Sequence, residues 1–422
     1  MSKLIITGQQ KLNGEITVAG NKNAAMPCLP AALLTTEPVT FTNIPDIIDV
    51  ATMLEIIQQL GAKVDRPTPD TVTITAKNIN TYELPDDLVA KLRSSILFMG
   101  PLLGRIGEFK MRHPGGCIIG RRPVGTHFNA VADLGGHVIT EDEHYHGTFT
   151  KQTNTEIFLD EASVTATENI LCLAAGTDEE TTILGAACEP HIANLAQLLS
   201  NMGAQISGAG TNRIHIKGTK QLHGTNHHIR SDQIETATFA IMAAASHGDI
   251  IIHQALQEDF HMIGHYLHAM GVDYTFTDPQ TLHITPSHLH APQNVKELQS
   301  RPWPGFPTDA LSPLIVLATQ ATGTTLVHEW MFEGRLLFAD SLVAMGANII
   351  TADPHRIIVN GPTPLRGKAL TSPDIRAGIA LVIAGLIAEG TTTIDNAQLI
   401  FRGYQNLPER LTSLGAKVEL IG

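Results

Sequence analysis

The sequence has little of what would place a protein at a membrane or on a nucleic acid. Its most apolar run, residues 377–390, is shorter than the roughly 20 residues that a transmembrane helix needs. The first ten residues lack the apolar centre and the cleavage site of a signal peptide. Lysine and arginine number 28 against 41 aspartates and glutamates, too few for the broad cationic surface of a non-specific nucleic-acid binder. We therefore expect a cytoplasmic protein with no membrane or nucleic-acid partner.

Metal-binding and disulfide patterns are also missing. The 20 histidines include no HExxH motif, no Cys/His knuckle and no carboxylate-flanked cluster. We therefore expect them at the surface and predict no metal site. The four cysteines share no metal or redox spacing, which favours free thiols. Three of them lie in apolar stretches, as is typical of small core residues: Cys28, Cys172 and Cys188.

What the sequence does contain is a short phrase, an apolar residue followed by glycine, that recurs six times about 70 residues apart. It reads LGAKV, LGGHV, MGAQI, MGVDY, MGANI and LGAKV, starting at residues 60, 134, 202, 270, 345 and 414. Each copy ends an amphipathic stretch and precedes alternating residues, so the glycine is predicted to close a helix before a strand begins. Six such helix–strand units indicate a mixed α/β fold.

The repeats also predict how the chain divides. At 422 residues it is too long for one ordinary core, so two domains are expected. The sixth unit ends before its closing strand, and residues 3–8 resemble the missing copy. We expect one lobe from residues 22–231 and another from residues 1–21 with 232–422. Each would hold three repeats, the second would be closed by both termini, and the two crossings between lobes form a candidate hinge.

Loops that depart from the repeat pattern mark candidate functional sites. The long, glycine-rich loop at residues 114–124 carries Cys117 beside two arginines, whose charges lower a thiol pKa and favour a reactive thiolate. Equivalent loops in the fifth and sixth units carry Arg335 and Arg402. Cations that converge at helix N-termini suit substrates with phosphate and carboxylate groups. The starts of the first helices add Lys22, Asn23, Arg93, Ser163, Asp309 and Arg376.

Each of these residues also has a simpler interpretation. A single arginine at a helix edge is most often a solvated surface charge. Asp309 stands where an N-cap would precede an apolar helix. Only the convergence of several such residues would indicate a site.

Six motifs, spread over the whole chain, carry a family resemblance: NKNAA at residue 21, LRSSI at 92, PGGCIIGRRPV at 114, FPTD at 306, DIRAG at 374 and RGY at 402. With them the sequence resembles the enolpyruvyl transferases, and its cysteine-bearing loop resembles their nucleotide-sugar branch, the UDP-N-acetylglucosamine 1-carboxyvinyltransferases. The resemblance implies a two-lobed α/β prism, or inside-out α/β barrel, with three repeats in each lobe.

The resemblance also implies an activity. The enolpyruvyl group of phosphoenolpyruvate moves to the 3′-hydroxyl of UDP-N-acetylglucosamine, and phosphate is released. The reaction proceeds by addition–elimination without a cofactor or metal, as the first committed step of peptidoglycan synthesis. The implied protein is a cytoplasmic monomer that fosfomycin inhibits.

Residue roles follow from the same resemblance. Cys117 is implied as a proton donor and Asp309 as the base that takes the sugar hydroxyl proton, with Lys22 and Arg402 also catalytic. The residues expected to bind phosphoenolpyruvate are Lys22, Asn23, Arg122, Arg335, Arg376 and Arg402. The residues expected to bind the UDP-sugar are Asn23, Arg93, Arg122, Pro123, Val124, Gly125, Thr126, Ser163, Val164, Asp309 and Met331.

Several positions depart from the family's usual pattern, mainly where the nucleotide is expected. Gly125 and Thr126 stand where aspartate and leucine usually follow the Arg-Pro-Val sequence. The other departures are Ile48, Glu161, His191, Gln233 and Gly334. The residues implied to bind phosphoenolpyruvate are all present. Two alternatives therefore remain to the implied function. One is the same transfer to a different nucleotide sugar or secondary-pathway acceptor, and the other is a catalytically silent paralogue.

Overall fold

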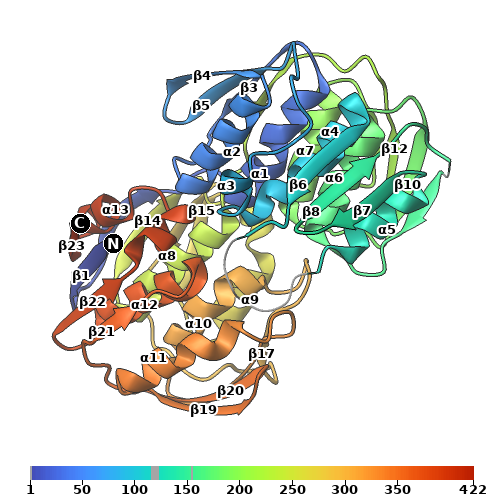
Figure 1. The fold of residues 1–422 in the computed structure, drawn as a ribbon. Coiled ribbons are helices and arrows are strands. Elements are labelled where there is room, and N and C mark those ends of the chain that lie inside the picture. Colours follow the sequence, from blue (N-terminus) through green and yellow to red (C-terminus); the bar gives the residue numbers. More distant parts are fainter. Residues whose placement is uncertain (1, 116–122, 154) are drawn as a thin grey trace. The chain divides into compact units, whose positions relative to one another are not determined.

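A computed structural model describes residues 2–115, 123–153 and 155–422 (Figure 1). The described residues form two compact units, one from residues 20–115 with 123–230 and the other from residues 2–19 with 231–422. Both units combine helices and sheets, so the predicted mixed α/β class is confirmed. None of the helices within these ranges has the length and apolarity to span a membrane.

The recurring phrase marks a helix-to-strand junction in all six repeats, as predicted. Its glycine has a positive φ in every copy, from 81° at Gly271 to 119° at Gly203, a conformation that glycine adopts without strain. The helix–strand pairs are α2 (Ile48–Gln59) with β4 (Lys63–Thr68), α5 (Gly125–Asp133) with β7 (His137–Glu141), α7 (Pro190–Asn201) with β11 (Gln205–Ser207), α9 (His261–Ala269) with β15 (Tyr274–Asp278), α11 (Ala339–Ala344) with β19 (Asn348–Asp353), and α13 (Leu407–Ser413) with β23 (Lys417–Ile421).

The unit of residues 20–230 places buried helices inside three sheets. Helix α1 (Lys22–Ala31) packs on α6 (Val164–Ala175), which also contacts α4 (Met99–Ile106). The sheets have the strand orders β13-β3-β5-β4, β6-β8-β7 and β11-β12-β10-β9. Their other strands are β3 (Pro38–Thr42), β5 (Thr71–Thr75), β6 (Glu108–Arg112), β8 (His144–Thr148), β9 (Glu156–Phe158), β10 (Glu180–Leu184), β12 (Arg213–Lys217) and β13 (Thr225–His228).

The unit of residues 2–19 and 231–422 repeats this plan. Helices α8 (Gln233–Ala245), α10 (Thr308–Gln320) and α12 (Ile375–Ile387) are almost entirely buried and pack on one another. Helix α12 contains most of the apolar run noted in the sequence, so that run is a core helix. Three sheets surround the helices, with strand orders β15-β16-β14-β2, β17-β18-β20-β19 and β21-β22-β1-β23. Their other strands are β1 (Lys3–Thr7), β2 (Asn13–Thr17), β14 (Asp249–His253), β16 (Thr281–Ile284), β17 (Leu298–Gln299), β18 (Gly323–His328), β20 (Arg356–Gly361), β21 (Ala369–Thr371) and β22 (Thr391–Asp395).

The N- and C-terminal strands share the last of these sheets. Strand β1 lies between β22 and β23 and is antiparallel to both, with Ile5 opposite Thr393 on one side and Glu419 on the other. The sixth repeat therefore takes its closing strand from the start of the chain.

Two expectations about side-chain burial are wrong in part. His127, His191 and His227 are buried, at 3–5% exposure, instead of facing solvent. Cys28 and Cys172 lie in the core, as expected, whereas Cys188 is only half-buried.

Candidate active site

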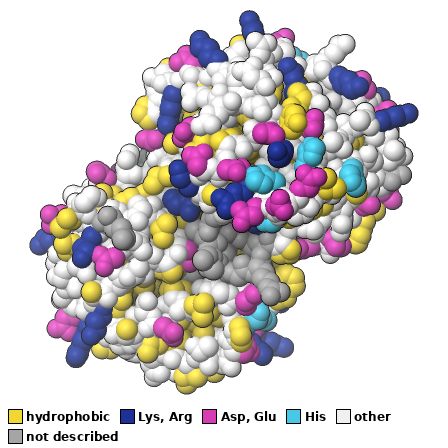
Figure 2. All heavy atoms as spheres, viewed as in Figure 1, with side chains coloured by type: hydrophobic (Ala, Val, Ile, Leu, Met, Phe, Trp, Pro, Cys, Tyr) yellow, Lys and Arg dark blue, Asp and Glu magenta, His cyan; other side chains and the backbone are white. Residues whose placement is uncertain are grey.

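The candidate residues fall in both units. Cys117 and Arg122 lie outside the described residues. On the face in Figure 2, acidic and basic side chains are interspersed, so no patch of one charge marks a site on that face. The ion pairs and hydrogen bonds of individual side chains define the candidate site instead.

Asp309 is the centre of an ion-pair cluster in the unit of residues 231–422. It is the second residue of α10, whose N-cap is Pro307 and has no side-chain capping bond, so the N-cap interpretation of Asp309 is wrong. Asp309 Oδ1 lies 3.1 Å from Arg335 Nη2, and Oδ2 lies 2.8 Å from Arg376 Nη2. The two arginine side chains are 4% and 8% exposed, whereas that of Asp309 is 24% exposed. The charges therefore meet where solvent reaches the cluster.

Arg376 is held by a further set of buried groups. Asp374 caps α12 by accepting the N–H of Arg376 at 2.7 Å. Arg376 Nη1 donates to Tyr404 Oη at 3.3 Å, and its guanidinium lies 5.8 Å from the centre of that ring. Burial acts to lower the pKa of Arg376, but Asp309, Tyr404 and Asp232 raise it overall. Burial raises the pKa of Tyr404 to about 12, so its hydroxyl stays neutral.

Arg335 presents a donor that no group among the described residues satisfies. It begins the short helix η4 (Arg335–Phe338) and is 5% exposed, with its guanidinium 5.4 Å from the centre of the Phe332 ring. Its Nε is buried and has no hydrogen-bond partner among the described residues. A buried donor of this kind is costly unless it meets an acceptor, so the position suits an anionic ligand.

The remaining predicted residues of this unit lie on neighbouring loops. Arg402 is the last residue of the short helix η5 (Ala397–Arg402), which packs on α12. Met331 lies between β18 and η4, and its backbone N–H donates to Glu329 Oε1 at 2.8 Å.

In the unit of residues 20–230, Lys22 is paired with a residue that the sequence did not single out. Asn21 caps α1 by accepting the N–H of Ala24 at 2.8 Å, and Lys22 and Asn23 follow in the first turn. Lys22 Nζ lies 2.6 Å from Asp49 Oδ2, in the first turn of α2, with side chains 12% and 5% exposed. The Asp49 carboxylate thus holds the Lys22 side chain at the start of α1, where an anion can bind.

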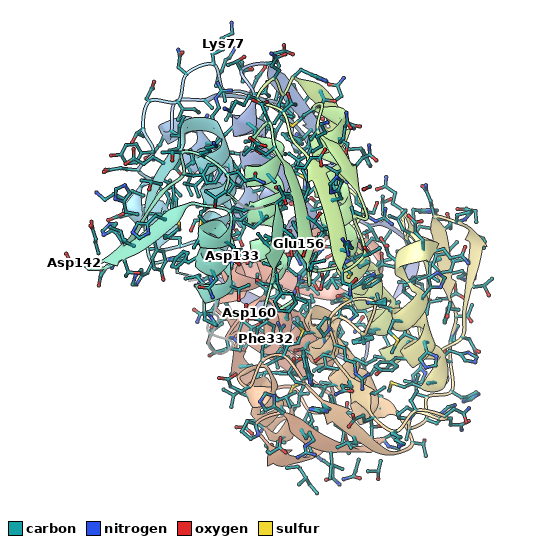
Figure 3. All side chains as sticks on the ribbon, turned by 90° about the vertical axis from the view of Figure 1, so that its right-hand side faces the viewer. Lys77, Asp133, Asp142, Glu156, Asp160 and Phe332 are labelled. Atoms are coloured by element: carbon teal, nitrogen blue, oxygen red, sulfur yellow. The ribbon has the colours of Figure 1, made fainter. Side chains whose placement is uncertain are left out.

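The residues predicted to hold the nucleotide lie at the starts of two helices. Gly125 and Thr126 begin α5, and Thr126 Oγ1 donates to Asp160 Oδ1 at 2.8 Å. Asp160, labelled in Figure 3, lies just beyond β9. Ser163 caps α6 by accepting the N–H of Ala166, and Val164 is the first helical residue. Thr126 is therefore engaged with a carboxylate from the neighbouring loop.

Arg93 begins the short helix η2 (Arg93–Phe98), and Arg93 Nη1 donates to the carbonyl of Pro114 at 3.5 Å. His127 is buried and shares a hydrogen bond of 2.8 Å with Thr165 Oγ1. Burial, and then the charge of Arg93, lower the pKa of His127 to about 4, so this imidazole is neutral near pH 7.

Sequence reasoning missed four residues that hold the predicted ones. Tyr404 belongs to the RGY motif but was not given a role. Asp49 stands next to Ile48, which was noted, and Glu329 stands two residues before Met331. A charge directly after an apolar strand could have marked Glu329. Thr238, which contacts Tyr404, gave no signal because it lies within an apolar helix.

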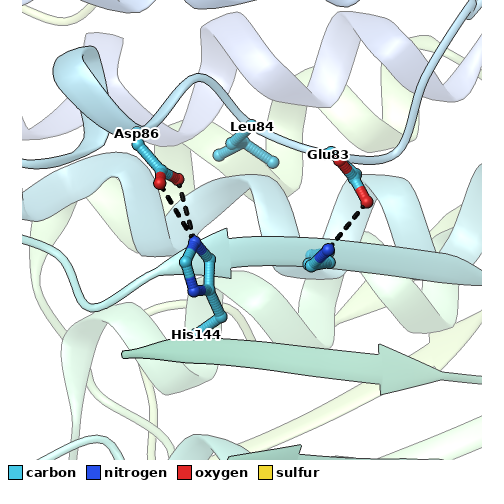
Figure 4. A pocket seen from close by; sticks show the side chains of 5 residues that line it. Glu83, Leu84, Asp86 and His144 are labelled. Atoms are coloured by element: carbon cyan, nitrogen blue, oxygen red, sulfur yellow. Dashed lines mark hydrogen bonds and ion pairs between the residues drawn. The ribbon is translucent and has the colours of Figure 1, made fainter. Parts of the chain in front are cut away.

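A polar pocket in the unit of residues 20–230 is lined by none of these residues (Figure 4). It has a volume of about 230 Å³ and is lined by Glu83, Leu84, Asp86, Lys110 and His144. Its charged groups pair with one another, Lys110 with Glu83 at 2.9 Å and His144 with Asp86 at 3.1 Å. Within the described ranges, no group of three or more His, Cys, Asp or Glu side chains could hold a metal ion.

Comparison with known proteins agrees with the sequence resemblance. A model of the EPSP synthase (3-phosphoshikimate 1-carboxyvinyltransferase) family matches residues 6–411. The chain is 42% identical to the UDP-N-acetylglucosamine 1-carboxyvinyltransferase of Treponema denticola, covering 100% of this chain and 99% of the relative. It is also 42% identical to that of Bradyrhizobium diazoefficiens, covering 99% and 97%. The crystal structure of the enolpyruvyl transferase NikO from Streptomyces tendae superimposes with a TM-score of 0.88 at 26% identity, covering 99% of this chain and 98% of that one. The chain belongs to the enolpyruvyl transferase family that this model describes, on the branch of the UDP-N-acetylglucosamine 1-carboxyvinyltransferases.

Proposed function

We propose that this protein transfers the enolpyruvyl group of phosphoenolpyruvate to the 3′-hydroxyl of UDP-N-acetylglucosamine and releases phosphate, as the first committed step of peptidoglycan synthesis. The observation that carries the proposal is the cluster of Asp309 with two buried arginines. It offers a base and a carboxylate-binding pair side by side. The names of relatives that match the whole chain support the same reaction. We propose that it takes place in the cytoplasm.

The two arginines bind the donor carboxylate in this proposal. Guanidinium groups bind carboxylates through paired N–H donors, and burial strengthens those bonds. Asp309 supplies the carboxylate that Arg335 and Arg376 contact in this structure. Entry of phosphoenolpyruvate draws the arginines toward its own carboxylate and releases Asp309, which then faces the acceptor hydroxyl without two cations on its oxygens.

The reaction needs two proton transfers in opposite directions. The acceptor oxygen bonds to C2 of phosphoenolpyruvate, Asp309 takes the hydroxyl proton, and a proton reaches C3. Cys117 is proposed as the donor of that proton. Loss of a proton from C3 and of phosphate from C2 then restores the double bond. Positioned acid–base groups of this kind contribute about 10²- to 10⁴-fold each.

The phosphate of the donor is assigned to Lys22, Arg122 and Arg402. Lys22 is supported by its ion pair with Asp49, which holds the ammonium at the start of α1, where helix N–H groups add to its attraction for anions.

The nucleotide sugar is assigned to the second set of predicted residues. The carboxylate that the family usually carries at position 125 is absent, but the hydrogen bond from Thr126 holds Asp160 beside that position. We therefore assign to Asp160 the task of accepting a base N–H of the nucleotide. The residues proposed to line the acceptor site are Asn23, Arg93, Pro123, Val124, Gly125, Thr126, Ser163, Val164 and Met331.

The direct test is phosphate release from phosphoenolpyruvate with a panel of UDP-sugars that includes UDP-N-acetylglucosamine. The wild type should release phosphate with this sugar at a rate that Asp309→Asn lowers by about a hundredfold or more. Glu333→Gln is the matched control, because it removes a negative charge from an exposed position two residues before Arg335.

Two results would contradict the proposal. Turnover with another UDP-sugar alone would keep the reaction and change the acceptor. No phosphate release with any sugar, despite binding of phosphoenolpyruvate, would favour the silent paralogue.

A further inference from the structure

Glu329 is a fully buried carboxylate that holds two parts of the candidate site. It follows β18 directly and is 0% exposed. Glu329 Oε1 accepts the backbone N–H groups of Met331 at 2.8 Å and Phe332 at 3.1 Å, and Oε2 accepts the Thr308 hydroxyl at 2.7 Å. Its own N–H donates to the carbonyl of His355 at 2.8 Å, and its carbonyl accepts His355 Nδ1–H at 2.7 Å. Both the side chain and the backbone of Glu329 are therefore held in place.

The bond to Thr308 reaches the start of the helix that carries the proposed base. Thr308 is the first residue of α10 and Asp309 is the second. Pro307, at the N-cap, makes no side-chain bond to the helix N–H groups. A negative charge near this uncapped N-terminus is favourable because of the helix dipole. Glu329 thus holds the first turn of α10, and with it the direction of Asp309.

The bonds to Met331 and Phe332 reach the loop that carries one of the arginines. Phe332 packs beneath the guanidinium of Arg335, 5.4 Å from ring centre to Cζ. Met331, on the same loop, is proposed to contact the acceptor. One carboxylate is therefore bonded both to the helix that presents Asp309 and to the loop that presents Arg335.

We propose that Glu329 is a positioning residue for the transfer reaction: it sets Asp309 and Arg335 at the separation at which they meet. This inference rests on the proposed function, since it assigns Glu329 its role through the proposed base and the donor clamp. The three hydrogen bonds of this carboxylate go to two segments, the start of α10 and the loop before Arg335. The carboxylate therefore fixes the position of one segment relative to the other, which a contact to the loop alone would not do. Small displacements of reacting groups are costly, because a misplacement of about 1 Å can lower a rate by about a hundredfold.

The sharpest test removes the hydrogen bond between Glu329 and helix α10 alone. Thr308→Val keeps the shape of the side chain but removes the donor to Glu329, while both loop bonds remain. Thr308→Ser keeps the hydroxyl and is the matched control. Thr308→Val should lower kcat by about tenfold with a smaller change in KM, and Thr308→Ser should stay within about twofold of the wild type. Equal kcat values for the two variants would overturn the proposal.

A second pair of variants tests the hydrogen bonds to the loop through the affinity for phosphoenolpyruvate, which can be measured without turnover. Glu329→Gln can still accept the two backbone N–H bonds and meet the Thr308 hydroxyl, whereas Glu329→Ala loses all three. Calorimetric titration with phosphoenolpyruvate should give an affinity about tenfold weaker for Glu329→Ala and within about threefold of the wild type for Glu329→Gln.

The possible outcomes distinguish this proposal from the proposed function. If the wild type releases phosphate but Glu329→Ala keeps normal kcat and affinity, Glu329 has no positioning role and the function stands. If the wild type binds phosphoenolpyruvate without turnover, the affinities of the two Glu329 variants still show whether Glu329 is a positioning residue. Equal losses of affinity in both, with equal losses in melting temperature, would leave only a structural role and overturn the inference.

Discussion

Asp309 and Arg376 form a close ion pair, 2.8 Å from Oδ2 to Nη2, although each has a separate task in the proposed reaction. Arg335 approaches the other oxygen of the same carboxylate at 3.1 Å. Both guanidinium groups are buried, and they meet the more exposed Asp309 where a ligand has access. The protein's own carboxylate thus stands in the place proposed for the carboxylate of phosphoenolpyruvate.

This arrangement predicts opposite effects of Asp309→Asn on binding and on turnover. Removal of the charge ends the competition for the arginines, so the affinity for phosphoenolpyruvate should rise by about three- to tenfold. Turnover should fall by about a hundredfold because the base is lost. Titration calorimetry and phosphate release measure the two quantities, with Glu333→Gln as the charge control. Weaker binding in Asp309→Asn would mean that Asp309 orients the arginines and does not compete with the donor.

The extent to which this site could be predicted differs between its parts. The six glycine phrases predicted the helix ends, since a left-handed C-cap has a local sequence signature. The motifs predicted Asp309 and Arg376 as members of a site, and the comparison of equivalent loops predicted Arg335. The sequence could not predict that the three contact one another, because ion pairs between separate repeats depend on how the helices pack.

The supporting residues were harder to find for a related reason. Glu329 and Tyr404 act through hydrogen bonds to backbone groups or to buried side chains, and such bonds leave no periodic pattern in the sequence. The burial of His127 was missed because a histidine in an amphipathic helix fits both a surface and a core position.

Tyr404 provides the second prediction, through a chain of hydrogen bonds with a defined direction. Thr238 donates its only hydroxyl proton to the carbonyl of Ile234 at 2.7 Å, so it must accept from Tyr404 Oη at 2.9 Å. The lone pairs of Tyr404 are therefore free to accept Arg376 Nη1–H. Tyr404→Phe keeps the ring but loses this acceptor.

Tyr404→Phe should raise the KM for phosphoenolpyruvate by about three- to tenfold, because a net hydrogen bond to a charged group contributes about 1.5–3 kcal/mol and water replaces part of it. Tyr266→Phe is the control, since the Tyr266 hydroxyl is also buried and bonded, to the backbone of Gln299. Steady-state kinetics and melting temperatures should show a stability loss in both variants and a KM change only in Tyr404→Phe. A similar KM for phosphoenolpyruvate in both variants would show that the Tyr404 hydroxyl does not contribute to binding of the donor.

His127 predicts how acid affects stability. Its folded pKa is lowered to about 4 from the ordinary 6.5, chiefly by burial. Its contribution to stability is complete above pH 6.5 and is lost as the pH falls from there toward 4, because the unfolded chain takes up the proton first. The loss amounts to about 2 kcal/mol at pH 5.

The variant His127→Gln should therefore lose less stability than the wild type between pH 7 and pH 5, by about that amount. Denaturant unfolding at both pH values provides the measurement. Substitution of the exposed His223 by Gln should leave the acid sensitivity unchanged. If His127→Gln is as sensitive as the wild type, the acid sensitivity comes from other groups.

The four thiols should differ in reactivity toward fosfomycin, a phosphonate epoxide. Burial raises the pKa of Cys28, Cys172 and Cys188, so each is mainly the unreactive thiol near neutral pH. Cys117, flanked by Gly-Gly and two arginines, should be alkylated first. Peptide mapping after brief exposure measures the order, with Cys117→Ser as the control, and first labelling of any other cysteine would contradict it.

The last prediction concerns the acceptor, where the sequence departs from the family. If Asp160, held by Thr126, takes the place of the usual carboxylate at position 125, Asp160→Asn should lower kcat/KM for UDP-N-acetylglucosamine by about ten- to a hundredfold, the effect of losing about 1–3 kcal/mol. A carboxylate can be returned at position 125, because a Cβ built on Gly125 meets no atom of the described residues within 4 Å. Gly125→Asp should therefore restore kcat/KM in the Asp160→Asn protein while changing the wild type little. Loss without rescue would mean that Asp160 only supports the start of α5. Turnover of a different UDP-sugar by the wild type, with none for UDP-N-acetylglucosamine at millimolar concentration, would show instead that the change at residues 125 and 126 has altered the acceptor.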